Sequence, residues 1–167
     1  MKTVMLRNVE VGCGKPKVIV PIVAATAQGI LEKAREFRAH ALDVVEWRVD
    51  FYEDVFQLPK VLSTLKGLRE ILGETPILFT FRTRKEGGEK EIDMEAYTAL
   101  NTAVAQSGDA DAVDVEVFSA GTFRPSTPRG KRWWAPTTTS AARRTRLTCS
   151  SACGRCRSWG RTFRRSR

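Results

Sequence analysis

Charged and apolar side chains alternate in the seven-residue stretch VVEWRVD at residues 44–50. Residues two apart on a β-strand share a face of the sheet, so Glu46, Arg48 and Asp50 are predicted to lie on one face. Strands of a parallel sheet are normally apolar throughout, because both of their faces are buried. Charges on one face therefore predict a strand whose end opens into a polar pocket, as at the active sites of barrel enzymes.

The same alternation recurs in two later stretches. Thr80 and Arg82 alternate with phenylalanines, and Asp114 and Glu116 alternate with valines. One such pair is most simply interpreted as strand-end charges that reach solvent. Three successive strands with this pattern favour a shared polar pocket, because a buried charge must be paired or it strongly destabilises the fold.

Strands and helices are predicted to alternate along the first 121 residues. Strands are predicted at residues 17–23, 43–49, 76–81 and 112–118, and helices at about residues 28–40, 55–72 and 93–107. Gly73 and Gly108 stand where helix ends favour a left-handed residue. Both a doubly wound sheet and a (β/α)8 barrel begin with this order of elements. The polar strand ends favour the barrel, with residues 1–14 as a short antiparallel hairpin across its bottom.

Charge divides the chain at about residue 121. Residues 1–121 hold 15 basic and 19 acidic side chains, whereas residues 122–167 hold 13 basic and no acidic ones. The second segment also lacks any apolar period of a strand or a helix. We therefore predict an α/β region in 1–121, formed by about four βα units of a partial (β/α)8 TIM barrel, and a disordered basic tail in 122–167.

Two stretches indicate a family. VVEWRVD at residues 44–50 resembles the second-strand motif of type I 3-dehydroquinate dehydratases. FTFRTRKEGGE at residues 79–89 resembles the third strand of that family and the loop that follows it. Supporting matches are VPIV at residues 20–23, residues 97–101 and DVEVF at residues 114–118. The likeness ends near residue 120.

The resemblance implies a (β/α)8-barrel enzyme of the shikimate pathway, which converts 3-dehydroquinate to 3-dehydroshikimate with loss of water. In that family a lysine forms a Schiff base with the substrate ketone and a histidine transfers the proton, with no metal or diffusible cofactor. Glu46 and Arg48 would then bind substrate hydroxyl groups, and Arg82 would bind nearby polar groups. Glu86 would be an accessory acid that steers the histidine, or alternatively a solvated charge in a glycine-containing loop.

The histidine and lysine of the family are not found at matching positions. His40 is the only histidine, and we predict a surface position for it near the end of the first helix. Read one base earlier, codons for residues 132–140 can give Val-Val-Gly-Ser-Tyr-His-Asp-Phe, and those for residues 156–167 can give Met-Gln-Glu-Leu-Gly-Ala-Asp-Leu-Pro-Lys-Ile-Ala. These resemble the family's histidine and lysine segments. We therefore predict a frameshift between Phe118 and Pro128, and little or no dehydratase activity for the chain as it stands.

Other functions fit parts of the sequence. The basic tail, with its tryptophans, is typical of a segment that grips nucleic acid. Cys149, Cys153 and Cys156 suggest a zinc site but lack a fourth ligand nearby. Another Schiff-base barrel enzyme, such as an aldolase, would share the fold. The shifted reading frame explains the tail composition better, and the two family stretches favour the dehydratase.

The expected partner is a small molecule, 3-dehydroquinate. No run of 18 apolar residues and no signal peptide is present, so a membrane is not an expected partner and the predicted location is the cytoplasm. Nucleic acid is not an expected partner either, because the main region carries more acidic than basic side chains. By resemblance, the intact family member would be a homodimer.

Overall fold

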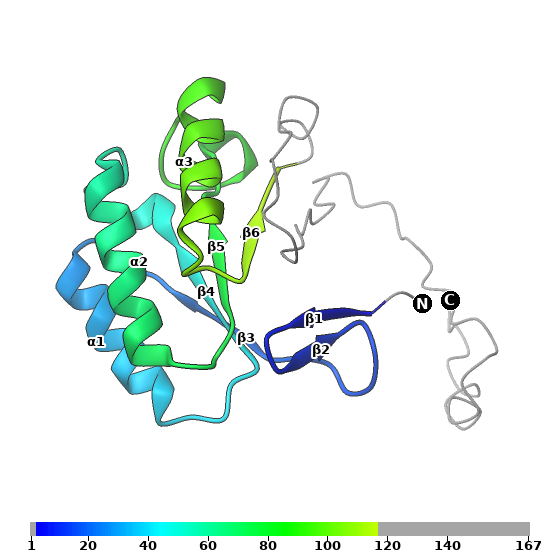
Figure 1. The fold of residues 1–167 in the computed structure, drawn as a ribbon. Helices are drawn as coiled ribbons and strands as arrows, with labels where there is room; N and C mark the ends of the chain where they lie inside the picture. Colours follow the sequence, from blue (N-terminus) through cyan, green and yellow to red (C-terminus); the bar gives the residue numbers. More distant parts are fainter. Residues whose placement is uncertain (1–2, 117–167) are drawn as a thin grey trace, which may run out of the picture.

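An antiparallel hairpin precedes four parallel strands and three helices in the computed structural model, which describes residues 3–116 (Figure 1). In chain order the elements are β1 (Val4–Leu6), β2 (Val9–Val11), β3 (Ile19–Ile22), α1 (Ala27–Arg38), β4 (Val44–Arg48), α2 (Leu58–Leu72), β5 (Ile77–Thr80), α3 (Met94–Ser107) and β6 (Ala112–Asp114). Two 3₁₀ turns, η1 (Val49–Phe51) and η2 (Arg84–Glu86), lie in the connections after β4 and β5. The tail for which we predicted disorder, residues 122–167, lies outside the described residues.

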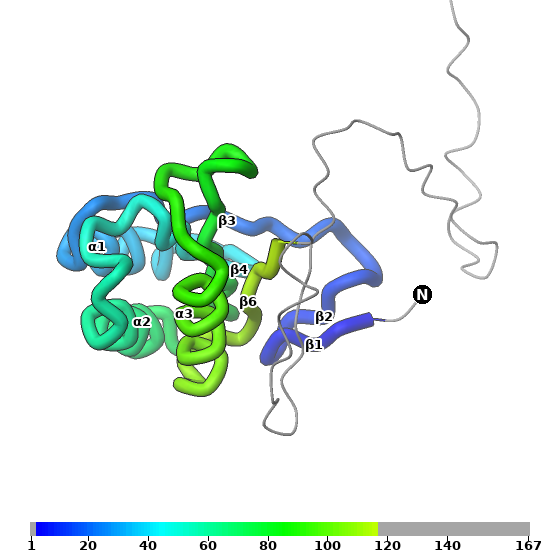
Figure 2. The backbone as a smooth tube through the Cα atoms, turned by 90° about the horizontal axis from the view of Figure 1, so that it is seen from above, coloured from blue at the N-terminus to red at the C-terminus, as the bar shows by residue number. Residues whose placement is uncertain are grey.

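The order of the strands identifies the type of sheet. Its order is β3-β4-β5-β6, and each neighbouring pair is parallel. The three helices all lie on one side of this sheet (Figures 1 and 2). A doubly wound sheet would reverse its strand order and carry helices on both faces. The prediction of barrel-type βα units is therefore confirmed.

Two of the described helices, α1 and α3, begin at a capping side chain. Thr26 precedes α1, and its hydroxyl accepts a hydrogen bond from the backbone N–H of Gly29 at 3.2 Å. Asp93 does the same for α3, accepting from the N–H of Ala96 at 2.8 Å. Each cap satisfies a backbone donor that has no partner inside its helix.

The predicted element boundaries hold to within a few residues, except that the predicted end of the last strand, at residue 118, lies outside the described residues. Gly73 and Gly108 end α2 and α3 as expected, with positive φ values of 57° and 87°. The second helix starts later than expected, at Leu58 rather than Val55, because residues 52–57 form hydrogen-bonded turns before it. Asp50 lies in η1 rather than at the end of the strand.

The apolar core lies between the sheet and the helices. Trp47 of β4 and Phe79 of β5 are fully buried there, with ring centroids 5.5 Å apart in a T-shaped contact. Leu65 and Leu68 of α2 are also fully buried. Burial of one such side chain stabilises a fold by about 1.5–3 kcal/mol, so this face holds the βα units together.

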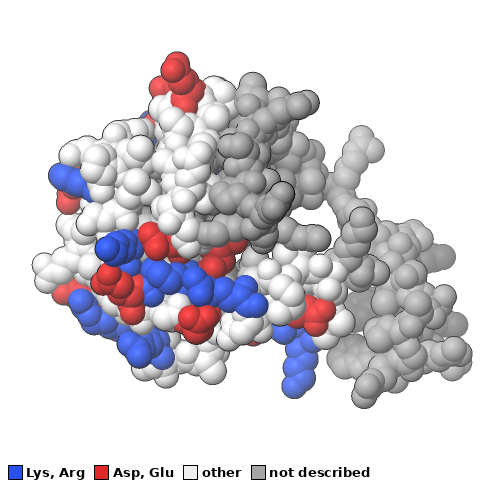
Figure 3. All heavy atoms as spheres, in the orientation of Figure 1, with Lys and Arg blue, Asp and Glu red and all other residues white. Residues whose placement is uncertain are grey.

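Ion pairs fix the hairpin to the N-terminal ends of the strands. Arg7, in the turn between β1 and β2, bonds Asp111 just before β6 at 2.7 Å and Glu74 after α2 at 3.2 Å. Arg69 of α2 also pairs with Asp111. Figure 3 shows basic and acidic side chains interleaved in a band across this side of the molecule. The expected position of the hairpin, across the bottom of the barrel strands, is confirmed.

Candidate active site

The face of the sheet that points away from the helices forms a cavity of about 340 Å³. Its polar lining comes from three neighbouring strands, with Glu46 on β4, Arg82 just after β5 and Asp114 at the end of β6. Its apolar lining includes Leu6 and Val11 of the hairpin. We call this cavity the cup. Apart from Lys17, its lining is apolar toward the bottom of the strands, and it is charged toward their C-terminal ends, where barrel enzymes place their active sites.

Arg48 shares the face of Glu46, because the two residues are two apart on β4. The carboxylate of Asp50 accepts two hydrogen bonds from the Arg48 guanidinium, at 2.9 Å from Nε and 2.8 Å from Nη2. These bonds raise the pKa of Arg48 above its usual value, against the opposing effect of burial. The guanidinium also lies 5.1 Å from the ring centroid of Phe51. Arg48 is thus held in one orientation beside the cup.

Arg82 is held by acids of the neighbouring strand. Its Nη2 donates to Asp114 Oδ2 at 2.5 Å, and its Nη1 lies 3.9 Å from Glu116 Oε1. Glu116 in turn accepts hydrogen bonds from the backbone N–H of Thr83 at 2.8 Å and from its hydroxyl at 2.9 Å. This network joins the end of β6 to the start of the loop after β5. Sequence reasoning noted Asp114 and Glu116 on the polar face but assigned them no role.

Asp114 is the most perturbed acid of the site. Its side chain is 3% exposed, and one carboxylate oxygen, Oδ1, has no hydrogen-bond partner. Burial raises the pKa of Asp114 to about 6, although Arg82 opposes the rise. The hydroxyl of Tyr97 on α3 supports this strand end, since it accepts from the N–H of Glu116 at 3.1 Å. Burial also raises the pKa of Tyr97, to about 12, so its proton is retained.

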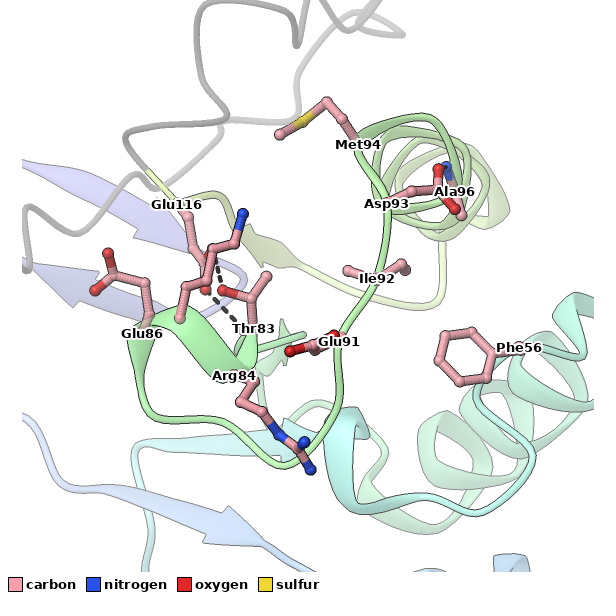
Figure 4. A pocket seen from close by; sticks show the side chains of 11 residues that line it. Phe56, Thr83, Arg84, Glu86, Glu91, Ile92, Asp93, Met94, Ala96 and Glu116 are labelled. Carbon is pink, nitrogen blue, oxygen red and sulfur yellow. Dashed lines mark hydrogen bonds between the residues drawn. The ribbon is translucent and has the colours of Figure 1, made fainter.

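Glu86 lies apart from the cup, on a second and wider cavity of about 690 Å³. Figure 4 shows its carboxylate directed away from Thr83, which also lines this wider cavity and bonds Glu116. Phe56 and Met94, both exposed, line the opposite side of this wider cavity. The structure therefore brings Glu46 and Arg82 together, places Arg48 beside them, and sets Glu86 at a neighbouring site.

Residues 3–116 hold no group of three His, Cys, Asp or Glu side chains arranged to bind a metal ion. His40 is exposed just after α1, as predicted. Cys149, Cys153 and Cys156, the basic tail and both segments of the proposed shifted frame lie outside the described residues. None of the described helices is long and apolar enough to cross a bilayer.

Curated relatives match this chain along its first part. A 3-dehydroquinate dehydratase of Clostridium botulinum (strain Eklund 17B) is 50% identical over 117 residues, which are 70% of this chain and 46% of that protein. A 3-dehydroquinate dehydratase of Listeria welshimeri is 50% identical over 119 residues, covering 71% of this chain and 47% of that protein. The chain thus spans about half the length of the curated relatives it matches.

The solved structures that this chain resembles are also 3-dehydroquinate dehydratases. A type I 3-dehydroquinate dehydratase from Clostridium difficile, with covalently modified comenic acid, superposes with a TM-score of 0.70 at 41% identity, over 71% of this chain and 46% of that one. The 3-dehydroquinate dehydratase of Enterococcus faecalis gives a TM-score of 0.68 at 42% identity, over 72% of this chain and 52% of that one. The family model for type I 3-dehydroquinase matches residues 18–132, which is more than half of the sequence. The chain therefore belongs to the type I 3-dehydroquinase family.

Proposed function

We propose that residues 1–121 form the substrate-binding half of a 3-dehydroquinate dehydratase. The observation that carries the proposal is that Glu46 and Arg82, from neighbouring strands, line one cavity of about 340 Å³ with Arg48 fixed beside it. The substrate offers hydroxyl, ketone and carboxylate oxygens. A carboxylate accepts hydrogen bonds from hydroxyl groups, and a forked guanidinium donates to oxygen atoms.

The chemistry proposed is elimination of water through a Schiff base. An iminium is a better electron sink than a ketone, and an imidazole has a pKa suited to proton transfer. By family resemblance, Glu86 would steer that imidazole once the histidine is present. No metal or diffusible cofactor is proposed.

We further propose that the chain as it stands binds 3-dehydroquinate but does not dehydrate it. Its single histidine, His40, lies at the exposed end of α1, and the cup is lined by no histidine among the described residues. Lys17 lines the cup, but it precedes β3 and so lies toward the bottom of the strands, away from Asp114. The family's histidine and lysine segments are those predicted in the shifted frame.

The test compares the 167-residue chain with a version in which the residues after Phe118 are replaced by the translation of the other frame. We expect 3-dehydroshikimate to form, by its absorbance, only with the second protein. Sodium borohydride with substrate should then add the mass of the reduced adduct only to that protein. Turnover by the 167-residue chain, or a trapped adduct on its Lys17, would overturn the proposal of inactivity. Inactivity of both proteins would overturn the proposed reaction.

Two further expectations concern the assembly and the location of the intact enzyme. The intact enzyme is proposed to be a homodimer and to act in the cytoplasm on a small polar substrate. Light scattering of the protein with the replaced C-terminal part tests the first expectation, and localisation of a fluorescent fusion tests the second.

A further inference from the structure

The loop after β5, residues 83–90, is closed at its base into one compact piece. Its first and last residues form a bridge between them. The carbonyl of Thr83 accepts hydrogen bonds from the N–H groups of Glu86 at 3.0 Å and Gly88 at 2.8 Å. A Cβ on Gly88 would lie 1.9 Å from the backbone oxygen of Arg82, so the loop folds back tightly onto the strand end. A displacement at one point of this loop therefore moves the rest of it.

Two carboxylates from outside the loop hold its backbone. Asp50, in η1, accepts a hydrogen bond from the Glu89 N–H at 3.2 Å. Glu116, after β6, accepts from the Thr83 N–H at 2.8 Å and from the Thr83 hydroxyl at 2.9 Å (Figure 4). The side chain of Asp50 is 0% exposed and that of Glu116 is 6% exposed. Buried carboxylates need donors around them, so each acid orders the loop and is ordered by it.

The same two carboxylates hold the two arginines of the site, through the same oxygen atoms. Asp50 Oδ2, which binds the loop, also accepts from Arg48 Nη2 at 2.8 Å, and Asp50 Oδ1 accepts from Arg48 Nε at 2.9 Å. Glu116 Oε1, which binds the other end of the loop, lies 3.9 Å from Arg82 Nη1. One shared oxygen on each side thus connects the loop to an arginine.

We propose that the loop is a positioning element of the cup, because its backbone N–H groups fix the two acids that orient the arginines. Asp50 carries this effect to Arg48, and Glu116 carries it to Arg82. Residues 83–90 do not line the cup, so the loop acts through these acids and not by touching a ligand there. A carboxylate that is fixed by a second donor holds a guanidinium in one direction, and a ligand then meets the guanidinium already oriented.

Glu86 belongs to the same loop, and its N–H is one of the groups that close the base. The order of the loop therefore sets the accessory acid and the two substrate-binding arginines together. This step rests on the proposed function. The positioning of the arginines by the loop does not, because it follows from hydrogen bonds within the ligand-free chain.

The first test measures the exchange of arginine Nε–H protons with water, by NMR of the ¹⁵N-labelled 167-residue chain without ligand. Gly88→Ala displaces the loop, and we expect it to speed exchange of the Arg48 Nε–H severalfold, because Asp50 is then held less firmly. Gly87→Ala, whose Cβ meets nothing within 4 Å, should have a smaller effect. The Arg69 Nε–H, which donates to the Asp109 carbonyl at the other end of the sheet, should keep its rate.

The Arg69 signal separates positioning from general loosening of the fold. Unchanged exchange at Arg48 in Gly88→Ala, or equal acceleration at Arg48 and Arg69, would overturn the proposal.

A second series tests the connection through Glu116. Thr83→Val removes the hydroxyl that donates to Glu116 and should speed exchange of the Arg82 Nε–H, whereas Thr83→Ser keeps a hydroxyl and should restore the original rate. Thr98→Val is the matched control, because the Thr98 hydroxyl donates within the exposed part of α3 and should not affect Arg82. If Gly88→Ala does not fold by circular dichroism, this series decides. An original rate in Thr83→Val would then contradict the proposal.

The consequence for binding is measured by isothermal titration with 3-dehydroquinate. We expect Gly88→Ala and Thr83→Val to weaken binding severalfold although neither residue lines the cup, and Thr83→Ser to restore it. Unchanged affinity in variants with faster arginine exchange would overturn the role of the loop in binding. If the original chain does not bind 3-dehydroquinate, the proposed function fails, and arginine exchange still decides whether the loop positions the arginines.

Discussion

Neighbouring residues of β4 lie on opposite faces of one sheet and differ in chemistry. Trp47 is fully buried against the helices, whereas Glu46 lines the cup on the other face. β5 repeats the contrast, with Phe79 in the helix-side core and Leu78 lining the cup, followed just after the strand by Arg82. The apolar core and the charged cup therefore use alternate residues of the same strands, so changes on the two faces should have separable effects.

The largest expected effect is on the helix side. Phe79→Ala removes a fully buried ring that packs on Trp47, and we expect it to lower the free energy of unfolding by about 3–5 kcal/mol. The matched change on the cup face is Leu78→Ala, which removes a partly buried side chain and should be clearly less destabilising. Urea denaturation followed by tryptophan fluorescence measures both. Equal losses would contradict the division between the two faces.

The second effect concerns pH and belongs to the cup face. The pKa of Asp114 is about 6 in the folded chain, against 3.8 for an ordinary aspartate carboxyl group, so between these values the folded state binds the extra proton. Stability contributed by this proton is present below about pH 4 and is lost as the pH rises through 6. The loss amounts to at most about 3 kcal/mol. Asp114→Asn cannot titrate, so its stability relative to the original chain should increase from pH 4 to pH 7.

Denaturation curves of both proteins at several pH values measure this difference in stability. The pH-dependent contributions of titratable groups that the two chains share cancel in it. The pairing of Arg82 with Asp114 is also broken in the variant, and this adds an offset to its stability. Only the change of the difference with pH reports the titration of Asp114. A difference that stays constant from pH 4 to pH 7 would show that the carboxyl group titrates normally.

The third effect concerns the loop that follows β5. A Cβ on Gly88 would lie 1.9 Å from the backbone oxygen of Arg82, so Gly88→Ala must displace the loop. Gly87→Ala is the control, because its Cβ meets nothing within 4 Å and the cost is only the strain of a positive φ, about 1 kcal/mol. We expect Gly88→Ala to be the more destabilising of the two changes. It should lower the free energy of unfolding by about 1–3 kcal/mol. It should also speed hydrogen exchange at the Thr83 amide, which donates to Glu116.

Alternation along single strands could be predicted from the sequence, because it is a local property. The shared face of Glu46, Arg48 and Arg82 followed from it, whereas the parallel strands followed from the order of strands and helices along the chain. The loop residue that bonds Asp50 could not be predicted from the sequence, because the hydrogen bond from the Glu89 N–H to Asp50 joins residues 39 apart. The orphaned oxygen of Asp114 was likewise invisible, since it depends on how Arg82 occupies the other oxygen. Alternation shows which side chains share a face but not which of them pair.

The smallest effect on stability should come from Glu46→Gln, which tests the cup from its half-exposed side. Glu46 is only partly buried, and no hydrogen bond ties its carboxylate to the other described residues, so we expect the free energy of unfolding to change by no more than about 0.5 kcal/mol. Binding of 3-dehydroquinate should nevertheless weaken, about tenfold, because a charged acceptor for substrate hydroxyl groups is lost. Isothermal titration and urea denaturation of the same variant measure the two quantities. Weaker binding by Glu46→Gln at unchanged stability would distinguish the cup from the core. Phe79→Ala, in contrast, should reduce binding only to the extent that it unfolds the chain. A variant that loses stability and binding together would mean that Glu46 supports the fold, and the assignment of the two faces would then be wrong at its central strand.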